Sequence, residues 1–327
     1  MIRRRELLTL LGGALVASPL AARAQQAMPV IGFLGVETPN AFADRVRGFR
    51  QGLSEMGYVE GRNVAIVFQW AGGNYGLLPT LADELVRQRV SVLVAISTAS
   101  AARAAKAATA TLPIVFFTGG DPVAAGLVTS LNRPGGNLTG ATGLGAELVP
   151  KRLELLREAV PAATSLGFMV NPANPPAPDY AMNAKDAAGT LGLDLHFLNA
   201  AGEHEFDGVF LKVLQLGAGG LVIYNDPYFT SRSEQLGALS VRHRVPAISV
   251  NRDFPAAGGL MSYGNSRNDS MRLVGVYTGR ILKGEKPADL PVQQPTKFEL
   301  FLNLNTAKTF GLTMPLSLLG RADGVIE

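Results

Sequence analysis

The amino-acid sequence predicts an α/β fold built from parallel β-sheets and divided between two similar halves. Short runs rich in Val, Ile and Leu alternate along the chain with helix-length segments whose apolar residues fall on one face. Gly-rich or polar turns separate these segments, and the alternation starts again after 137–144. Regular alternation of strands and helices favours parallel sheets with right-handed crossovers.

The first half opens on the apolar run 29–34, which is short and free of charged residues, as are parallel strands buried on both faces. A helix follows at 42–56, where apolar residues recur at helical spacing until Gly57 ends it. By the same reasoning we expect strands at 64–70, 90–96 and 113–117, and helices at 77–89, 97–110 and 124–131.

The second half repeats the pattern. Helices are expected at 149–160, 180–191, 205–216 and 230–242, and strands at 165–171, 193–198, 220–224 and 246–250. A helix at 268–282 and a strand-like segment at 299–304 come last. Neither half has enough strands for its own sheet unless these late elements are shared between them. The sequence therefore predicts discontinuous lobes with several crossings.

The first 24 residues have the layout of a secretory signal peptide. A basic start is followed by an apolar stretch and by the small-x-small triplet Ala22-Arg23-Ala24. The stretch is shorter than the about 20 residues that a membrane-spanning helix needs. Arg4 and Arg5 also fit a twin-arginine export signal, and an ordinary Sec signal is the alternative. We expect cleavage after Ala24 and export to the periplasm.

The composition argues against nucleic-acid binding and against a lipid anchor. The chain has 30 basic and 26 acidic residues, but four arginines and one glutamate belong to the signal. The remaining 26 basic and 25 acidic residues give a net charge of +1, too little for a basic binding face. The sequence contains no cysteine, so neither disulfides nor a lipidated cysteine are expected. About 300 residues can supply a core without them.

Motifs of catalysis are missing from the sequence. It has three histidines, and although Glu203-His204-Glu205 is rich in potential ligands, no second histidine stands at metal-binding spacing. There is no Gly-x-Ser-x-Gly elbow. The Gly-rich segment 217–220 precedes a strand instead of following one, unlike a dinucleotide fingerprint. We therefore expect neither an enzyme nor a cofactor or metal.

Several segments, taken in order, resemble a known family. They are 48–53 (GFRQGL), 55–58 (EMGY), 121–123 (DPV), 126–128 (GLV), 133–140 (RPGGNLTG), 305–308 (NTAK), 310–315 (FGLTMP) and 318–323 (LLGRAD). Together they resemble the ABC-transporter substrate-binding family related to tryptophan- and other amino-acid-binding proteins. The likeness covers nearly the whole chain after the signal.

The resemblance implies the type I periplasmic-binding-protein fold, in which two doubly wound parallel-sheet lobes are joined by a three-strand hinge. By the family pattern the first lobe takes 29–139 plus 255–290, and the second takes 140–254 plus 291–327. It further implies a monomer that closes on a small solute, an amino acid or a derivative, and delivers it to an ABC permease. A periplasmic sensor that presents its ligand to a membrane receptor is the alternative.

Ligands of open parallel sheets bind beyond the carboxyl ends of the strands, which selects candidate residues in the first lobe. Ser97 and Thr98 open a helix and could receive an amino-acid carboxylate or cap that helix. Both roles can also be filled at once, with Ser97 as the cap and Thr98 in contact with the ligand. Asp121 could likewise bind an ammonium or cap the helix expected to begin near Pro122, and capping is favoured. Trp70, the only tryptophan, could stack on a ligand or cover the sheet edge. Strand ends also supply Thr38, Asn40 and Thr118.

The same rule selects residues in the second lobe. Asn171 and Asn174 follow one expected strand, and Asn225 and Asp226 follow another. Asp226 could bind a ligand amine or cap the next helix. Tyr263 follows the returning strand near an expected crossing. We expect the ligand to lie between these two sets of side chains.

Overall fold

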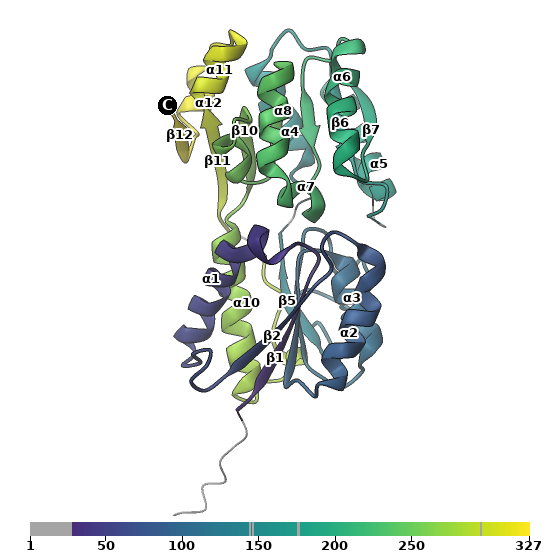
Figure 1. Ribbon diagram of the computed structural model, residues 1–327, viewed down its shortest axis with the longest axis vertical. Coiled ribbons are helices and arrows are strands. Elements are labelled where there is room, and N and C mark those ends of the chain that lie inside the picture. The colour runs from purple at the N-terminus through teal and green to yellow at the C-terminus, as the bar shows by residue number, and fades with distance from the viewer. Residues whose placement is uncertain (1–27, 144, 146, 175–176, 295) are drawn as a thin grey trace, which may run out of the picture.

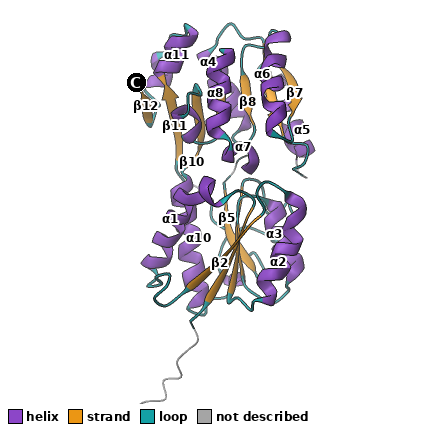
Figure 2. Cartoon of the chain, viewed as in Figure 1, coloured by secondary structure: helices purple, strands orange, loops and turns teal. Residues whose placement is uncertain are grey.

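The computed structural model describes residues 28–143, 145, 147–174, 177–294 and 296–327. The signal peptide expected at 1–24 lies outside the described residues. The chain forms two lobes stacked along the long axis of the molecule, each with its own sheet and helices on both faces (Figure 1, Figure 2). The doubly wound α/β architecture predicted from the sequence is therefore confirmed.

Within the described residues the first lobe contains a five-stranded sheet in the order β2-β1-β3-β4-β5, and every neighbouring pair is parallel. Its strands are β1 (Val30–Gly35), β2 (Ala65–Trp70), β3 (Val92–Ala95), β4 (Ile114–Thr118) and β5 (Leu138–Thr142). Four helices cover it: α1 (Pro39–Glu55), α2 (Leu78–Arg87), α3 (Ala99–Ala108) and α10 (Arg267–Leu282). A 3₁₀ turn, η1 (Tyr75–Leu77), precedes α2, and another, η3 (Pro287–Asp289), follows α10.

Both faces of this sheet are apolar, because helices pack on each. Ile31 and Phe33 of β1 point into a core shared with α1 and α10, whereas Leu34 points into a core shared with α2 and α3. All three side chains are fully buried. This explains why β1 is a continuous apolar run instead of an alternating one.

Helix α10 returns to the first lobe through a close backbone contact with α1. A Cβ atom at Gly52 would lie 1.9 Å from the carbonyl oxygen of Arg272. One at Gly275 would lie 2.2 Å from the carbonyl oxygen of Phe49. Glycine is therefore required at both positions for the two helix backbones to touch. The late helix completes the first lobe, as the discontinuous reading of the sequence predicted.

The second lobe contains a seven-stranded sheet in the order β12-β11-β10-β9-β8-β6-β7, counted over the described residues. Its strands are β6 (Ser165–Val170), β7 (Asp194–Asn199), β8 (Leu221–Ile223), β9 (Ala247–Ser249), β10 (Met261–Asn265), β11 (Phe298–Asn303) and β12 (Gly324–Ile326). Strands β10 and β11 run antiparallel, and the other neighbouring pairs run parallel.

Helices again pack on both faces. On one face lie α4 (Val149–Ala159), α5 (Ala177–Thr190), α11 (Leu304–Phe310) and α12 (Leu316–Leu319). On the other lie α6 (Phe206–Gln215), α8 (Ser233–His243) and α9 (Asp253–Ala256), with the 3₁₀ turn η2 (Glu203–Glu205) before α6 and the short α7 (Pro227–Ser231) before α8. No helix in the described ranges combines the length and apolar character needed to cross a membrane.

In the described part of the chain, the backbone passes between the two sheets three times: after β5, after β10 and before β11. Arg152 of α4 ties two of these crossings together. Its Nε donates to the carbonyl of Tyr263 at 2.8 Å, and its Nη1 donates to the carbonyl of Gly145 at 3.1 Å. Burial lowers the pKa of Arg152 to about 10, so the guanidinium is still charged at neutral pH.

One expected helix is absent. Residues 124–131 form no helix, because the backbone makes a single turn after Asp121 that Gly126 ends with φ +68°. The amides of Ala125 and Leu127 bond to carbonyls three or more residues back, and the turn stops there. The expected helix at 124–131 was therefore wrong.

The lobe boundaries expected from the family pattern also differ from the observed pairing. Residues 137–144 were expected to join the halves, but β5 is the edge strand of the first sheet. Strand β10 falls in the range 255–290 assigned to the first lobe, yet it pairs with β9 and β11 in the second sheet. Of that range, α10 is the helix that packs on the first lobe, because its apolar face joins the core beside α1.

Candidate functional site

The carboxyl ends of the parallel strands of the two sheets face one another where the lobes meet (Figure 1). A small cavity of about 40 Å³ lies there and is lined by residues of both lobes. Its lining combines polar residues of both lobes, several of them at strand ends, with two glycines and four apolar side chains. These residues are Glu37, Phe42, Arg45, Ser97, Phe117, Gly119, Gly143, Asn225, Pro227, Thr230, Asn265 and Met271.

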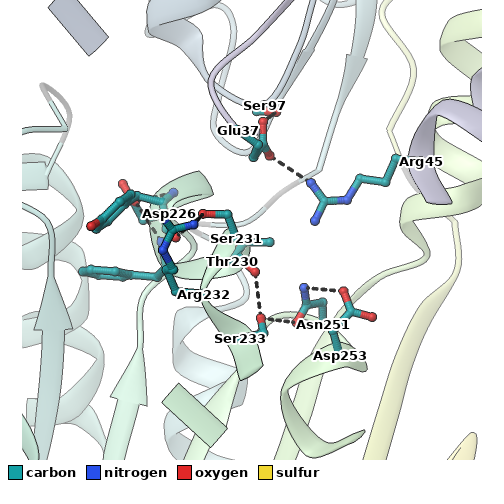
Figure 3. Close-up of polar contacts among 12 residues, drawn as sticks. Glu37, Arg45, Ser97, Asp226, Thr230, Ser231, Arg232, Ser233, Asn251 and Asp253 are labelled. Atoms are coloured by element: carbon teal, nitrogen blue, oxygen red, sulfur yellow. Dashed lines mark hydrogen bonds and ion pairs between the residues drawn. The ribbon is translucent and has the colours of Figure 1, made fainter. Parts of the chain in front are cut away.

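A buried ion pair is the chemical centre of this cavity (Figure 3). Glu37, directly after β1, is only 2% exposed, and Nη1 of Arg45 donates to its Oε1 at 2.8 Å. The hydroxyl of Ser97 donates to its other oxygen, Oε2, at 2.6 Å. The guanidinium of Arg45 also lies 4.6 Å from the ring centre of Phe42. Both charges are thus held in place by neighbours in the first lobe.

Ser97 and Thr98 divide the two roles in the opposite way to the division suggested from the sequence, since Thr98 is the cap and Ser97 lines the cavity. Thr98 caps α3, because its Oγ1 accepts from the amide of Ala101 at 3.2 Å, and its side chain lines neither cavity. Ser97 lines the small cavity and has φ +84°, which is uncommon for a residue with a side chain. That backbone conformation turns its hydroxyl toward Glu37 and away from the helix.

Asn225 brings an uncommitted amide from the second lobe. Over the described residues its side chain has no hydrogen-bond partner, although it lines the small cavity opposite Glu37 and Ser97. A Cβ atom at Gly119 would lie 2.7 Å from its Nδ2, so a side chain there would displace the amide of Asn225 from its present position. An amide offers both donors and an acceptor to a bound molecule.

A second, larger cavity of about 540 Å³ adjoins the first, and Arg45, Thr230 and Asn265 line both. The two are therefore neighbouring parts of one cleft. The large cavity is mostly polar: Asn40 and Asp44 line it from the first lobe, and Ser233, Asn251, Arg252 and Asp253 from the second. Several of these side chains already bond to one another, as Ser233 does to Asn251 and Asn251 to Asp253 (Figure 3).

Asp226 is a fully buried acceptor and lines neither cavity. It caps α7 by accepting from the amides of Tyr228 and Phe229, and the side-chain amides of Asn171 and Asn174 donate to it at 3.2 and 2.9 Å. Burial raises the pKa of Asp226, against the opposing effect of these hydrogen bonds. Three predicted site residues, Asn171, Asn174 and Asp226, thus converge on one network inside the second lobe.

Other predicted residues lie away from both cavities. Trp70 packs with Phe33, Phe42 and Phe68, and its ring stacks on Phe68 at 5.8 Å, so it covers the edge strand β2. This is the second of the two roles that the sequence allowed for it.

The remaining four predicted residues line neither cavity. Thr38 is the N-cap position of α1, and Thr118 is buried at the end of β4. Asp121 accepts from the amide of Val123 at 2.7 Å, so it caps a single turn in place of the helix expected there. The ring of Tyr263 packs on Phe298 at the hinge.

Sequence reasoning missed Glu37 and Arg45. Glu37 obeys the same strand-end rule as its neighbours Thr38 and Asn40 and could have been selected by it. Arg45 lies inside a helix, and the strand-end rule does not apply to helix residues. No feature of the neighbouring sequence distinguishes it from a surface arginine. Among the residues that the structure describes, no three His, Cys, Asp or Glu side chains come together in a way that could hold a metal ion.

Two lobes, two facing sheets and a polar cleft at their strand ends define a hinged binding protein of the type I periplasmic-binding-protein fold. Residues 33–326 match the family described as ABC transporter substrate binding protein, and the chain belongs to that family.

Three proteins illustrate the relationship. The tyrosine-binding protein of Clostridioides difficile is 25% identical over 272 residues, which are 81% of this chain and 76% of that protein. The crystal structure of an ABC domain of Streptococcus pneumoniae in complex with L-Trp is 25% identical, with a TM-score of 0.82. A conserved domain protein of Vibrio cholerae is 26% identical, with a TM-score of 0.84. Each structural match covers 91% of this chain and 99% of the other.

Proposed function

We propose that the protein binds an amino acid between its lobes and delivers it to an ABC permease. The observation that carries the proposal is the buried pair of Glu37 and Arg45, which faces the uncommitted amide of Asn225 across the cleft. A zwitterion offers one positive and one negative group. The pair offers a carboxylate and a guanidinium held side by side.

Each member of the pair keeps capacity for a ligand. A carboxylate can accept about four hydrogen bonds, and Glu37 accepts two, from Arg45 and Ser97, in the described part of the chain. A guanidinium has five N–H donors, of which Nη1 of Arg45 uses one toward Glu37. We place the ligand ammonium on Glu37 and the ligand carboxylate on Arg45. Charge-assisted hydrogen bonds of this kind are the strong ones.

The apolar lining fits an aromatic or large aliphatic side chain. Phe42, Phe117 and Met271 line the same small cavity as the charged pair. Aromatic rings and methionine offer adaptable apolar contact to such a group. The ligands named for two relatives, L-Trp and tyrosine, have this chemistry.

The position of the cleft supports a closing mechanism. Both cavities are lined by residues of the two lobes, so separation of the lobes would open the cleft to a ligand and closure would surround it. The ligand then bridges Glu37 of one lobe and Asn225 of the other and shifts the population toward the closed form. The closed form is the one that docks on the permease. The signal-like segment 1–24 supports a periplasmic location.

Isothermal titration calorimetry with L-tryptophan, L-tyrosine, L-leucine and L-glutamate tests the proposal. We expect one site per chain and micromolar affinity, about −8 kcal/mol, for an aromatic or aliphatic amino acid, with L-glutamate far weaker. Absence of binding by any amino acid at millimolar concentration contradicts it.

A further inference from the structure

A hydrogen bond joins the two lobes outside the two cavities described above. The hydroxyl of Tyr75, in η1 of the first lobe, donates to Oδ2 of Asp226 in the second lobe at 2.9 Å. Building on the proposed function, we propose that Tyr75 and Asp226 form a latch that stabilises the closed protein and sets ligand affinity without touching the ligand.

The carboxylate of Asp226 accepts several hydrogen bonds from its own lobe in addition to the one from Tyr75. Its side chain is 0% exposed, and every partner it has within its own lobe is a donor: two side-chain amides and two backbone amides. Such a cluster holds a carboxylate in a fixed position. In the described residues Tyr75 is the donor that comes from the other lobe. Burial and the nearby Asp226 raise the pKa of Tyr75, so its hydroxyl stays protonated and able to donate.

Glycines of the first lobe let the backbones meet around this bond. Gly73 has φ +89°, and a Cβ atom there would lie 2.6 Å from Cδ2 of Tyr228, two residues beyond Asp226. A Cβ atom at Gly120 would lie 2.7 Å from the hydroxyl of Tyr180. The lobes therefore fit closely at the latch, and a side chain at either glycine would hold them apart.

The latch is linked to the ligand by position. Asp226 stands between Asn225 and Pro227, which both line the small cavity, while neither Tyr75 nor Asp226 lines it. Closing the latch brings Asn225 opposite Glu37 and Ser97. The apparent dissociation constant of a ligand that binds the closed form varies inversely with the closed population. A contact that raises that population therefore raises affinity.

Tyr75→Phe tests the latch, because it removes one hydroxyl and keeps the ring. Small-angle X-ray scattering of the ligand-free protein should give a larger radius of gyration for Tyr75→Phe than for the wild type. With saturating L-tryptophan or L-tyrosine the two should coincide. The dissociation constant should rise about tenfold, as expected for a lost hydrogen bond to a carboxylate.

Tyr277→Phe is the matched control. Its hydroxyl donates to the carbonyl of Pro291 at 2.7 Å and accepts from Nε2 of Gln293 at 3.0 Å, and Gln293 pairs with Ala141 of the first sheet. Tyr277→Phe thus removes hydrogen bonds of the first lobe and none to the second, so it should leave the ligand-free radius and the affinity unchanged. Gly73→Ala is a second route to the same effect and should open the ligand-free protein as Tyr75→Phe does.

Equal ligand-free radii for wild type, Tyr75→Phe and Gly73→Ala would overturn the latch. The scattering comparison needs no ligand. If neither amino acid binds the wild type, the proposed function fails while the latch is still decided by the scattering result.

Discussion

Replacing Glu37 by glutamine removes one charge from the centre of the cleft and keeps the shape of the side chain. Glu37 is 2% exposed and holds two short hydrogen bonds, at 2.8 Å from Arg45 and 2.6 Å from Ser97. Glutamine has one acceptor oxygen where the carboxylate has two, and its amide nitrogen would face a donor. The variant leaves Arg45, whose side chain is 10% exposed, without its counterion.

The structure sets the size of both expected effects. Breaking a buried pair by removing one partner costs about 3 kcal/mol, or roughly 5 °C in Tm for a chain of this size. Losing the partner of the ligand ammonium should cost about 2 kcal/mol or more of binding, roughly thirtyfold in Kd. Differential scanning calorimetry measures the first effect, and isothermal titration with L-tryptophan or L-tyrosine measures the second.

Glu60→Gln is the matched control for Glu37→Gln. Its carboxylate pairs with Arg50 at 2.5 Å on the surface of the same lobe, with side chains 30% and 47% exposed. Such surface pairs are worth about 0–1 kcal/mol, so Tm should hardly change and Kd should stay the same. A folded Glu37→Gln protein that binds with wild-type affinity would refute the placement of the ammonium.

Three further predictions follow from the strand ends and one helix start. Ser97→Ala should weaken ligand binding about tenfold in calorimetry, whereas Thr98→Ala, which removes a helix cap, should lower stability by about 1 kcal/mol in urea unfolding and leave Kd within twofold. Reversed effects would contradict the roles assigned to them. Gly119→Ala should impair closure by pressing on Asn225, seen as weaker binding with little change in Tm; unchanged binding would contradict this. The amides of Ala201 and Gly202 donate to the carboxylate of Glu205 and lower its pKa. The stability that this carboxylate contributes is therefore present above the ordinary glutamate pKa and is lost as pH falls through the lowered pKa. Glu205→Gln should reduce the loss of folding stability at acid pH, and an unchanged loss would contradict this role.

The strands that could be predicted are those buried between two layers of helices. β1 and β3 are continuous apolar runs because helices pack on both faces, and that pattern is visible in one sequence. β5 was missed because its sequence, LTGAT, has little apolar bulk, although all five residues are buried. The hydroxyl of Thr139 donates a hydrogen bond to the carbonyl of Leu290, which is 151 residues away in the sequence. No local pattern reveals such a partner.

The cleft could be predicted only as a region. The strand-end rule found Ser97 and Asn225, which line the small cavity, and it also selected Thr98, Asp121 and Asp226, which cap turns or helices. Ser, Thr, Asp and Asn serve both purposes, because the same side-chain oxygens accept from free backbone amides or from a ligand. The direction in which each loop turns decides between them, and that direction depends on packing between segments far apart in sequence.

The most direct test of amino-acid binding in the cleft is a titration of the purified protein without residues 1–24, unfolded and refolded to remove any carried ligand, with L-tryptophan and L-tyrosine. We expect one site per chain with micromolar affinity for at least one of them, weakened at least thirtyfold by Glu37→Gln and unchanged by Glu60→Gln. No heat of binding from any amino acid, or equal affinity in the wild type and Glu37→Gln, would contradict it.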